Sequence, residues 1–544
     1  MLKESRTNVS CEDTKNNSDR EERKMSFMEA MKHELLDNHN TAYTENGAVG
    51  YRTTGKSLLD LNFSVASLRR ATDYDIAVKF RNAYFEDKRL AVLWLFYARD
   101  VRGGLGERNL FRSAFKFLAD ENPDMVISLV SLVPEYGRYD DLWVLLDEPT
   151  FREPVLDFVK KQLNRDVLNM HANQPVSLLA KWLPSVNASS ETTKKYAKMV
   201  YNHFNMRPAE YRKLLSKLRK YIGVIEVKMS AKDWSEIDYS NVPSRANLIY
   251  NKAFLRNDEA RRRQFLSAVE NGEAKINAGT LYPHDIVAKY CNHNYWCESV
   301  GDYDSGLESL WASLPDTVNG CGNTLVVADG SGSMTTSVGK SNVTALDVAN
   351  ALAIYFSERC SGEFKNNYIT FSMNPQFVHF NDGAPLRDKL SIAFQHDECA
   401  NTNIEAVFDL ILSTAVKSHM YQEDMPKNIV IISDMEFDAC ARSNYTGNYD
   451  RLGSMAGKSL FKALADKYDS VGYKLPRLIF WNVNSRTGTI PMIENEMGVV
   501  LVSGFSVNIC KMVMNGQTDP YDCLVETLNS ERYSPVDEKI CKFL

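Results

Sequence analysis

The sequence predicts a two-domain protein: an all-α helical-repeat module followed by a doubly wound α/β domain. The chain has 544 residues, which is too long for one ordinary domain and fits two. From about residue 60 to 300, amphipathic helical segments follow one another with short Gly, Pro, Asn or Asp breaks. From residue 324 onward, short apolar runs alternate with longer helical segments, which is typical of a parallel sheet covered by helices on both faces.

The expected domain limits follow from these changes in pattern. Residues 1–40 are rich in Asn, Ser, Glu and Lys and poor in large apolar side chains, which predicts a disordered or loosely helical polar tail. We place the helical module at residues 41–318 and the α/β domain at residues 319–544. The helical module shows no strict sequence period, so its repeats are inferred from successive helices with short connections.

The charge of the chain is unevenly distributed. Apolar residues make up 44% and charged residues 25%, values typical of a globular protein with a sizeable core. The net charge is −6, but residues 1–300 carry 45 basic and 40 acidic side chains, whereas 301–544 carry 19 and 30. Residues 151–300 alone hold 24 basic and 15 acidic side chains. We therefore expect the two ends of the protein to meet different partners.

The distribution of apolar residues and cysteines argues against a membrane or secreted protein. No apolar stretch approaches the roughly 18 residues of a spanning helix. The N-terminus is polar and lacks the hydrophobic region of a secretory signal. The ten cysteines have no tight repeated spacing, which suits a reducing compartment. We expect a cytoplasmic protein with no membrane partner.

Oxygen-bearing side chains cluster where the predicted strands end. The first strand of the second domain runs into Asp329, Ser331 and Ser333, with glycines between them that let the backbone turn sharply. Thr402 opens a later predicted helix, and Asp434 ends another apolar strand. Because ligands bind at the carboxyl edge of such a sheet, we expect these oxygens to meet there. They suit Mg²⁺ or another hard divalent cation, although Asp, Gly and Ser are also ordinary turn residues.

This set of five residues resembles the metal-ion-dependent adhesion site of von Willebrand factor A domains in residue types, order and spacing. The resemblance covers about residues 320–530 and implies a Rossmann-like domain. It also implies that the serines and the threonine ligate the metal, that the aspartates bind directly or through water, and that a partner's acidic oxygen takes one position. Because no nucleophile with its base lies nearby, we expect a binding surface and not an enzyme. We expect Glu436 and Asp438 to form a solvated acidic loop.

Several motifs of the first domain resemble the TROVE module of the Ro ribonucleoprotein autoantigen and related proteins. They are RDVRGGLGERNLFR at 99–112, VPEYGRYDDLW at 133–143, LLAKWLPS at 178–185 and YRKLLSKLRK at 211–220. In Ro proteins, and in uncharacterised plant, fungal and giant-virus proteins, a helical-repeat (HEAT-like) module likewise precedes a von Willebrand A domain. The resemblance implies binding of small noncoding or misfolded RNA. The charged residues of these motifs, which we expect to lock helices together, are Arg99, Arg102, Arg108, Arg138 and Asp140.

Basic residues of the helical module are the candidates for RNA contact. On one predicted helix, Lys213, Lys217 and Lys220 fall at i, i+4 and i+7 and share a face. Such a row would follow the phosphates of RNA and make the affinity depend on salt. A solvated helix face is the alternative that the same spacing allows. The further candidates are Arg212, Arg219, Lys160, Lys161, Arg261 and Arg262.

Residues Gly50–Ser57 satisfy the phosphate-loop pattern G-x-x-x-x-G-K-S. In a true phosphate loop a buried strand leads into the glycines, whereas polar residues precede this pattern. We therefore expect a turn before the first packed helix.

A possible zinc site consists of His284, Cys291, His293 and Cys297. Their spacing fits no common zinc module. We expect an ordinary helix end with buried cysteines there.

The function expected from the sequence is that of a non-enzymatic scaffold. The helical module would hold small noncoding or misfolded RNA, and the α/β domain would bind a divalent metal and a protein partner that supplies a carboxylate. The alternative is a protein-only assembly or adhesion-type scaffold without nucleic acid. A P-loop NTPase acting through Gly50–Ser57 is a third hypothesis.

Overall fold

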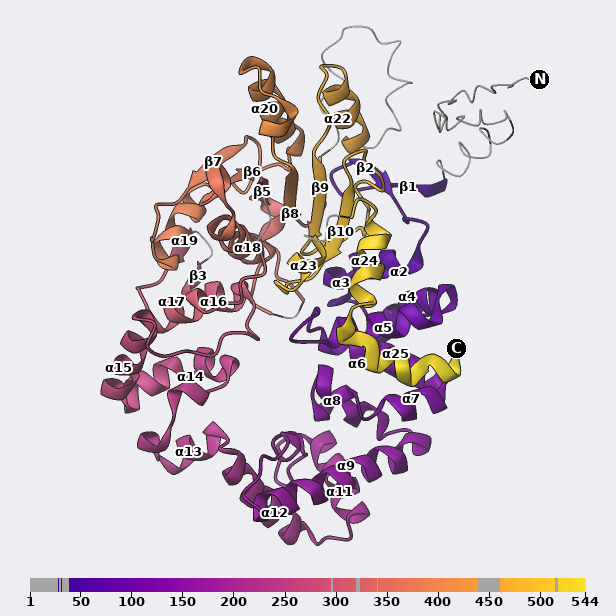
Figure 1. The fold of residues 1–544 in the computed structure, drawn as a ribbon, viewed down its shortest axis with the longest axis vertical. Coiled ribbons are helices and arrows are strands. Elements are labelled where there is room, and N and C mark those ends of the chain that lie inside the picture. The colour runs from indigo at the N-terminus through magenta and orange to yellow at the C-terminus, as the bar shows by residue number, and fades with distance from the viewer. Residues whose placement is uncertain are drawn as a thin grey trace, which may run out of the picture. The chain divides into compact units, whose positions relative to one another are not determined.

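The structure is a computed structural model, whose fold is drawn in Figure 1. It describes residues 39–294, 297–318, 323–339, 341–438, 460–513 and 517–544, together with positions 28 and 31. The polar tail expected over 1–40, apart from a few positions, and the boundary expected after residue 318 lie outside these ranges. Residues Ala42–Leu544 form one compact unit, to which the following description applies.

The part of this unit before residue 318 is mainly helical and contains two short hairpins. Its hairpins are β1 (Thr41–Tyr43) with β2 (Val49–Tyr51), and β3 (Cys291–Asn294) with β4 (Cys297–Val300). Its helices are α2 (Ser57–Phe63), α3 (Val65–Leu68), α4 (Asp73–Glu86), α5 (Lys88–Arg99), α6 (Arg108–Glu121), α7 (Pro123–Leu129), α8 (Val133–Tyr136), α9 (Pro149–His171), α10 (Leu179–Trp182), α11 (Glu191–His203), α12 (Pro208–Ile222), α13 (Ile225–Ala231), α14 (Ser244–Asn257), α15 (Glu259–Glu270), α16 (Pro283–Tyr290) and α17 (Ser305–Ala312).

Local sequence explains where these helices begin and which of them is central. At the start of α4, Thr72 accepts a hydrogen bond from the backbone of Asp75, whose carboxylate accepts one from Thr72 in return. Helix α5 is buried from Leu90 to Arg99 because α4, α6 and α8 pack around it. A helix that is apolar on every side is expected to be buried in this way. None of the described helices is long and apolar enough to span a bilayer.

The second part alternates strands and helices, as the sequence predicts. Its strands are β5 (Thr324–Asp329), β6 (Asn367–Phe371), β7 (Gln376–His379), β8 (Asn428–Ser433), β9 (Arg477–Asn482) and β10 (Val499–Ser503). Its helices are α18 (Ala345–Arg359), α19 (Leu386–Gln395), α20 (Ile404–Lys417), α22 (Leu460–Asp469), α23 (Ile509–Val513), α24 (Pro520–Leu528) and α25 (Ser534–Ile540).

The six strands form one sheet in the order β10-β9-β8-β5-β6-β7. All neighbouring strands are parallel except β6 and β7, which are antiparallel. Counted in chain order, this is the 3-2-1-4-5-6 arrangement of a doubly wound sheet, and the direction of winding reverses between β5 and β8. The prediction of an α/β fold for this part is confirmed.

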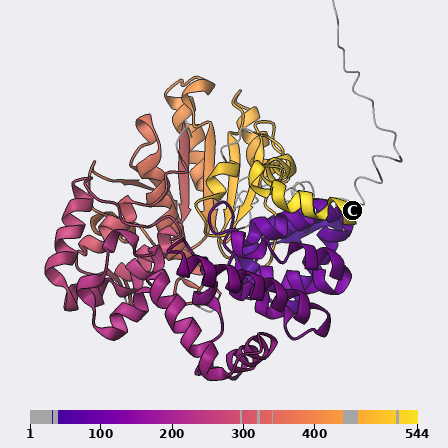
Figure 2. The ribbon, with the colours of Figure 1, turned by 60° about the horizontal axis from the view of Figure 1, so that its bottom comes forward.

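Helices cover both faces of the sheet, as two successive residues of β9 show. The ring of Phe480 lies 4.7 Å from that of Phe461 on α22, measured between centroids. The ring of Trp481 lies 5.5 Å from that of Phe356 on α18. Successive side chains of a strand point to opposite faces, so α22 and α18 lie on opposite sides of the sheet, which Figure 2 shows from a second direction.

The last helices of the chain pack on the first part. Helices α24 and α25 contact α5, and α25 also contacts α7, so the yellow and indigo segments meet in Figure 1. The ring of Tyr533 stacks on that of Tyr136 with centroids 5.8 Å apart. Arg532 pairs with the buried carboxylate of Asp100 at 2.8 Å. Residues close to the C-terminus therefore complete the packing of helices that begin near residue 88.

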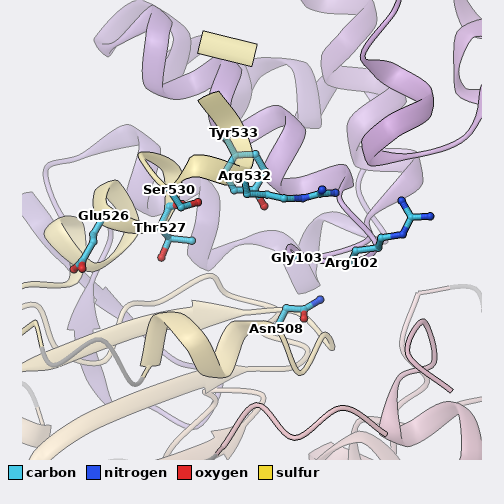
Figure 3. A pocket seen from close by; sticks show the side chains of 8 residues that line it. All are labelled: Arg102, Gly103, Asn508, Glu526, Thr527, Ser530, Arg532 and Tyr533. Atoms are coloured by element: carbon cyan, nitrogen blue, oxygen red, sulfur yellow. The ribbon is translucent and has the colours of Figure 1, made fainter. Parts of the chain in front are cut away.

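The charged residues of the helical motifs have two kinds of position. Arg99 forms a fully buried ion pair with Asp141 at 2.7 Å, and Asp140 pairs with Arg112 of α6 at 3.1 Å, so the expected locking role is confirmed for Arg99 and Asp140. Arg138 pairs with Asp140, two residues away, at 2.7 Å. Arg102 is exposed and lines a cleft of about 500 Å³ between the two parts (Figure 3). Arg108 is also exposed. The other residues that line the cleft are Gly103, Asn508, Glu526, Thr527, Ser530, Arg532 and Tyr533.

Candidate metal centre

The candidate metal residues lie where the winding of the sheet reverses. Asp329 is the last residue of β5, and Asp434 directly follows Ser433, the last residue of β8. The two strands are neighbours, and the Ser433 hydroxyl donates a hydrogen bond to Asp329 Oδ2 at 2.6 Å. The carboxyl ends of two such strands form the crevice in which doubly wound sheets bind ligands.

The loop after β5 brings two serines to Asp329. The backbone N–H of Ser331 donates to Asp329 Oδ1 at 2.9 Å, and the hydroxyl oxygens of Ser331 and Ser333 are 3.1 Å apart. The loop before α20 passes close to position 332, which is glycine: a Cβ there would lie 3.0 Å from the backbone oxygen of Cys399. The serine hydroxyls therefore lie together beside the first carboxylate.

Thr402 reaches the same edge of the sheet through the loop before α20. The N–H of Gly332 donates to the backbone oxygen of Ala400 at 3.0 Å, which fastens this loop to the serine loop. Thr402 and Asp438 exchange two hydrogen bonds of 3.1 Å, which fasten it to the segment after Asp434. The structure thus brings all five predicted residues to one edge of the sheet. That they ligate a metal stays a prediction.

Two buried carboxylates dominate the electrostatics of this site. The side chains of Asp329 and Asp434 belong to residues that are 1% and 0% exposed. Burial, together with the negative charge of Asp434, raises the pKa of Asp329 to about 7. Burial also raises the pKa of Asp434, and the Ser333 hydroxyl and the Arg486 guanidinium oppose that rise. A bound cation would offset the repulsion between the two carboxylates.

The donor set fits a hard divalent cation. Two carboxylates and three hydroxyls offer only oxygen, which Mg²⁺ prefers, and leave positions for the waters that it usually keeps. Among the described residues, no donor makes a hydrogen bond to the buried Oδ2 of Asp434, from which the Arg486 guanidinium lies 3.4 Å away. No group of three or more His, Cys, Asp or Glu that could hold a metal occurs within the described ranges. The hydroxyls are therefore essential to this candidate site.

A left-handed turn fixes Asp434. Met435 has a φ of 63°, which is uncommon for a residue with a side chain and costs about 1–3 kcal/mol. The N–H of Met435 donates to the Ser433 hydroxyl at 2.9 Å, and the N–H of Glu436 donates to Asp434 Oδ1 at 3.2 Å. These two bonds hold the Asp434 carboxylate in place and direct the chain to Glu436.

Glu436 does not belong to a solvated acidic loop, so the sequence-based expectation is wrong for this residue. Its side chain is fully buried. Oε1 accepts hydrogen bonds from the N–H groups of Arg486 and Thr487 at 2.8 and 2.9 Å, and Oε2 accepts one from the N–H of Glu45 at 2.9 Å. The expectation failed because these donors come from segments that no local pattern links to residue 436.

Three residues that the sequence did not indicate lie against the site: Glu45, Asn46 and Arg486. The Asn46 side-chain amide donates to the Thr402 hydroxyl at 3.2 Å and to the backbone oxygen of Glu436 at 2.7 Å. The Glu45 carboxylate pairs with Arg486 at 2.8 Å. Glu45 and Asn46 stand in a short polar stretch between β1 and β2, where the sequence alone gives no sign of contact with a distant sheet.

Three arginines that were expected to contact RNA are engaged inside the fold. Arg262 is 0% exposed, and its guanidinium donates to the side-chain oxygens of Asn247 and Asn251. Arg219 and Arg261 each donate to two backbone carbonyls of neighbouring segments. The prediction of RNA contact is wrong for Arg262, and the guanidinium donors of the other two bind the protein itself. Their positions along a helix do not reveal these partners.

Helix α12 presents the remaining basic candidates to solvent. Leu215 and Leu218 are buried on the opposite side of this helix, and Arg212 is exposed. On α9, Lys161 is exposed, whereas Lys160 is half-buried and donates to the backbone oxygen of His203 at 3.3 Å. The exposed lysines of α12, called the lysine face below, form no ion pair with another described residue; they are Lys213, Lys217 and Lys220.

Residues 52–56 form the expected turn before the first packed helix; of the phosphate-loop pattern, Gly50 lies in β2 and Ser57 begins α2. Two threonine side chains of this turn donate to the Asp60 carboxylate, and the Ser57 N–H donates to Glu86 Oε2 at 2.6 Å. These carboxylates therefore accept hydrogen bonds from O–H and N–H groups that a phosphate loop would direct at phosphate oxygens. This arrangement argues against a nucleotide site.

Only part of the possible zinc set lies at the expected helix end: His284 is in α16, whereas Cys291 and His293 lie in β3 and Cys297 begins β4. His284 is buried in α16, its ring stacks on Tyr282, and burial lowers its pKa to about 4. Cys291 is half-buried where α16 ends, so the expected burial of a cysteine is only partial there. The side chains of His293 and Cys297 lie outside the described part of the structure.

Comparisons with known proteins divide the chain at the start of the sheet. Residues 187–323 match the family described as Domain of unknown function (DUF2828), and residues 323–539 match Domain of unknown function (DUF7788). The chain is also similar to Uncharacterized protein L728 of Acanthamoeba polyphaga mimivirus, with 28% identity over 536 residues that cover 91% of this chain and 89% of the viral protein. The two family matches support a two-part arrangement in which the second part contains the whole six-stranded sheet and the candidate metal residues.

Proposed function

We propose that this chain is a non-enzymatic binding scaffold whose α/β part binds a divalent cation, above all Mg²⁺, and a protein partner that supplies a carboxylate. The observation that carries this proposal is the convergence of two buried carboxylates and three hydroxyls where the winding of the sheet reverses. A bound cation would neutralise the carboxylates and offer its remaining positions to water or to a partner's oxygen. In this proposal the cation and its ligands serve to bind the partner and not to catalyse a reaction.

Finer family relationships are part of the same proposal. The five metal candidates resemble the adhesion site of von Willebrand factor A domains, and the strand order is of the doubly wound kind that such a site needs. The helical motifs resemble a TROVE module with HEAT-like repeats over residues 41–318, followed by the α/β domain at 319–544. We propose the cytoplasm as its compartment, because cysteines without paired spacing suit a reducing environment.

Isothermal titration calorimetry with Mg²⁺ on the chelator-treated full chain tests the metal site. We expect saturable binding of one ion, weakened about tenfold or more in Asp434→Asn and in Ser331→Ala. Asp522→Asn is the matched control, because Asp522 is an exposed aspartate on α24. The proposal fails if no ion binds, or if Asp434→Asn and Ser331→Ala bind as tightly as the unchanged chain.

RNA binding is the second candidate function, and the exposure of the lysine face favours it. Three lysines spaced by one helical turn, with the exposed Arg212 beside them, can follow a phosphate backbone. Arg219, Arg261 and Arg262 donate hydrogen bonds to groups of the protein itself. The candidate RNA-binding surface is therefore restricted to α12 and to Lys161 on α9.

Fluorescence anisotropy with a labelled single-stranded RNA at increasing salt tests this second function. We expect binding that weakens steeply with salt and is largely lost in the triple variant Lys213→Glu, Lys217→Glu, Lys220→Glu. Reversal of three exposed lysines in the second part, Lys417, Lys539 and Lys542, is the control for net charge. Equal binding by both triple variants, or no binding by the unchanged chain, would leave the protein-only scaffold as the function.

A further inference from the structure

We propose that the Glu45–Asn46 turn is a built-in occupant of the metal centre, and that a partner carboxylate gains access by displacing it. This inference rests on the proposed metal-dependent function and adds a regulatory step to it. The turn belongs to the same chain but lies more than 280 residues from Asp329, the first of the metal candidates. In this proposal the turn is a covering segment that its own contacts hold against the site.

The contacts of this turn are concentrated on the segment after β8. The hydroxyl of Thr44 donates to the backbone oxygen of Phe437 at 2.6 Å, and Gly47 forms a β-bridge with Asp438. Between them, the N–H of Glu45 donates to the buried carboxylate of Glu436. Each residue from 44 to 47 thus contacts the strand end that carries Asp434 or the loop of Thr402.

The hairpin is shaped to present this turn. The N–H of Thr44 donates to the backbone oxygen of Ala48 at 3.0 Å, and the N–H of Gly47 donates to that of Thr44 at 3.1 Å. Gly47 has a φ of 86°, a left-handed conformation that favours glycine. The tight turn leaves the side chains of Glu45 and Asn46 outside the hairpin, where they meet the metal centre.

The side chains of the turn have the chemistry expected of an outside partner. Asn46 donates to the hydroxyl of Thr402, one of the five candidate ligands. Glu45 brings a carboxylate to Arg486, whose guanidinium also lies 3.4 Å from Asp434. An acidic partner loop could make the second of these contacts, because it would offer a carboxylate to Arg486 in place of that of Glu45.

Burial of the ligands explains why the turn must move. Asp329, Thr402 and Asp434 are 1%, 2% and 0% exposed, and the Asn46 side chain occupies the hydroxyl of Thr402 through its hydrogen bond, so a partner that approaches this hydroxyl has to displace Asn46. Glu45 and Asn46 are themselves exposed, and the pair of Glu45 with Arg486 is open to solvent on the Glu45 side. Exposed contacts of this kind are weak enough to be exchanged for a partner's.

Exchange kinetics of Mn²⁺ on the full chain test the covering role. The probe is Mn²⁺ alone, followed by the relaxation of water protons as the ion binds and as EDTA removes it. We expect the double variant Glu45→Ala, Asn46→Ala to take up and release Mn²⁺ at least tenfold faster than the unchanged chain. We also expect its dissociation constant to change much less than either rate, because a cover slows entry and exit alike.

Two further variants keep the test decisive. Tyr43→Ala changes an exposed side chain of the same hairpin that is 61% exposed, and we expect it to leave both rates unchanged. Glu45→Gln removes only the charge that pairs with Arg486, and we expect an intermediate acceleration even if the double variant is poorly folded. Equal rates in all variants, with Mn²⁺ still bound, would overturn the covering role alone. Absence of Mn²⁺ binding in every protein would overturn the proposed metal site and this inference with it.

Discussion

Glu436 joins three segments of the chain through one buried carboxylate. Its two oxygens accept hydrogen bonds from the N–H groups of Glu45, Arg486 and Thr487. Removal of the carboxylate would take the acceptor from all three amides, and a hydrogen bond to a charged group contributes about 1.5–3 kcal/mol. The residue therefore positions both the turn of Glu45 and the backbone of Arg486 beside the candidate metal residues.

We predict that Glu436→Ala lowers the free energy of unfolding by about 3 kcal/mol or more, because three backbone donors lose their acceptor. Thermal and denaturant unfolding of the full chain measure this loss. Glu423→Ala, which changes an exposed glutamate, serves as the control and should shift stability by less than about 0.5 kcal/mol. Equal effects of the two substitutions would show that Glu436 is not a structural tether.

His284 makes stability depend on pH in a defined direction. Its ring is buried between Tyr282 and Phe505, and its pKa is lowered to about 4. Between pH 6.5 and 4 the unfolded chain binds a proton that the folded chain rejects, so the stability contributed by this residue is lost as pH falls. At about 1.4 kcal/mol per pH unit, the loss between pH 6.5 and 5 is about 2 kcal/mol.

We predict that the difference in unfolding free energy between the unchanged chain and His284→Phe shifts by about 2 kcal/mol between pH 7 and 5, in favour of the variant at the lower pH. Phenylalanine keeps the ring packing and removes the titrating group. Parallel stability profiles for the two proteins over this range would contradict a buried neutral His284.

At the residue scale, sequence reasoning found the metal candidates but not the residues around them. Asp329 and Asp434 follow apolar strands, and the topology of a parallel sheet brings such positions together. The positions of Asn46 and Arg486 depend on how a hairpin and a loop dock on that edge. Packing over the whole fold determines how these segments dock, and local sequence patterns do not predict it.

Helix α12 shows how basic residues on one element can have opposite roles. Arg219 donates to the backbone oxygens of Ala180 and Leu183, which ties α12 to α10 and to the residue that follows α10. Lys217 lies on the lysine face and is exposed. Helical periodicity gives the angular position of both side chains, but it does not say which neighbour each one meets.

We predict that Arg219→Ala lowers the free energy of unfolding by about 2–3 kcal/mol, because two buried carbonyls lose a charged donor. Lys217→Ala, on the same helix, should change it by less than about 0.5 kcal/mol. Chemical denaturation of both variants measures the contrast. A destabilisation by Lys217→Ala as large as that by Arg219→Ala would contradict the assignment of roles on α12.

Among the elements, the long helices and the buried strands were predictable, whereas the short hairpins were not. Apolar runs such as that of β8 read directly as buried strands. Strands β1 and β2 have three residues each, too few for a periodic signal, and the bridge from Tyr51 to Ile490 helps to hold them. Because such a strand depends on a partner that is distant in sequence, its own residues show no clear strand pattern.

In the whole molecule, the last two helices contribute to the packing of the first part. Tyr533 is buried, stacks on Tyr136, and its hydroxyl lies 3.3 Å from the Asp100 carboxylate. The sequence predicted helical segments in both parts, but such a pattern does not indicate which element a helix packs against. The division into 41–318 and 319–544 was based on a change in the local pattern of apolar residues. Such a pattern gives no information about contacts between the two parts.

We predict that Tyr533→Ala destabilises the protein by about 3–5 kcal/mol, because it removes a large buried ring and leaves a cavity between α5 and α25. Hydrogen exchange should become faster in α5, α7 and α24 together, and much less so in α12. Tyr74→Ala, at a residue that is 76% exposed, is the control and should leave exchange unchanged. Faster exchange confined to the C-terminal helices would contradict shared packing.

The proposal of a divalent cation site at the reversal of the sheet is tested most directly by anomalous diffraction from crystals of the full chain grown with Mn²⁺. We predict one strong anomalous peak within bonding distance of the hydroxyls of Ser331 and Ser333, and close to the carboxylates of Asp329 and Asp434. A site without any peak, with Arg486 still against Asp434, or a peak at some other place in the fold, would contradict it.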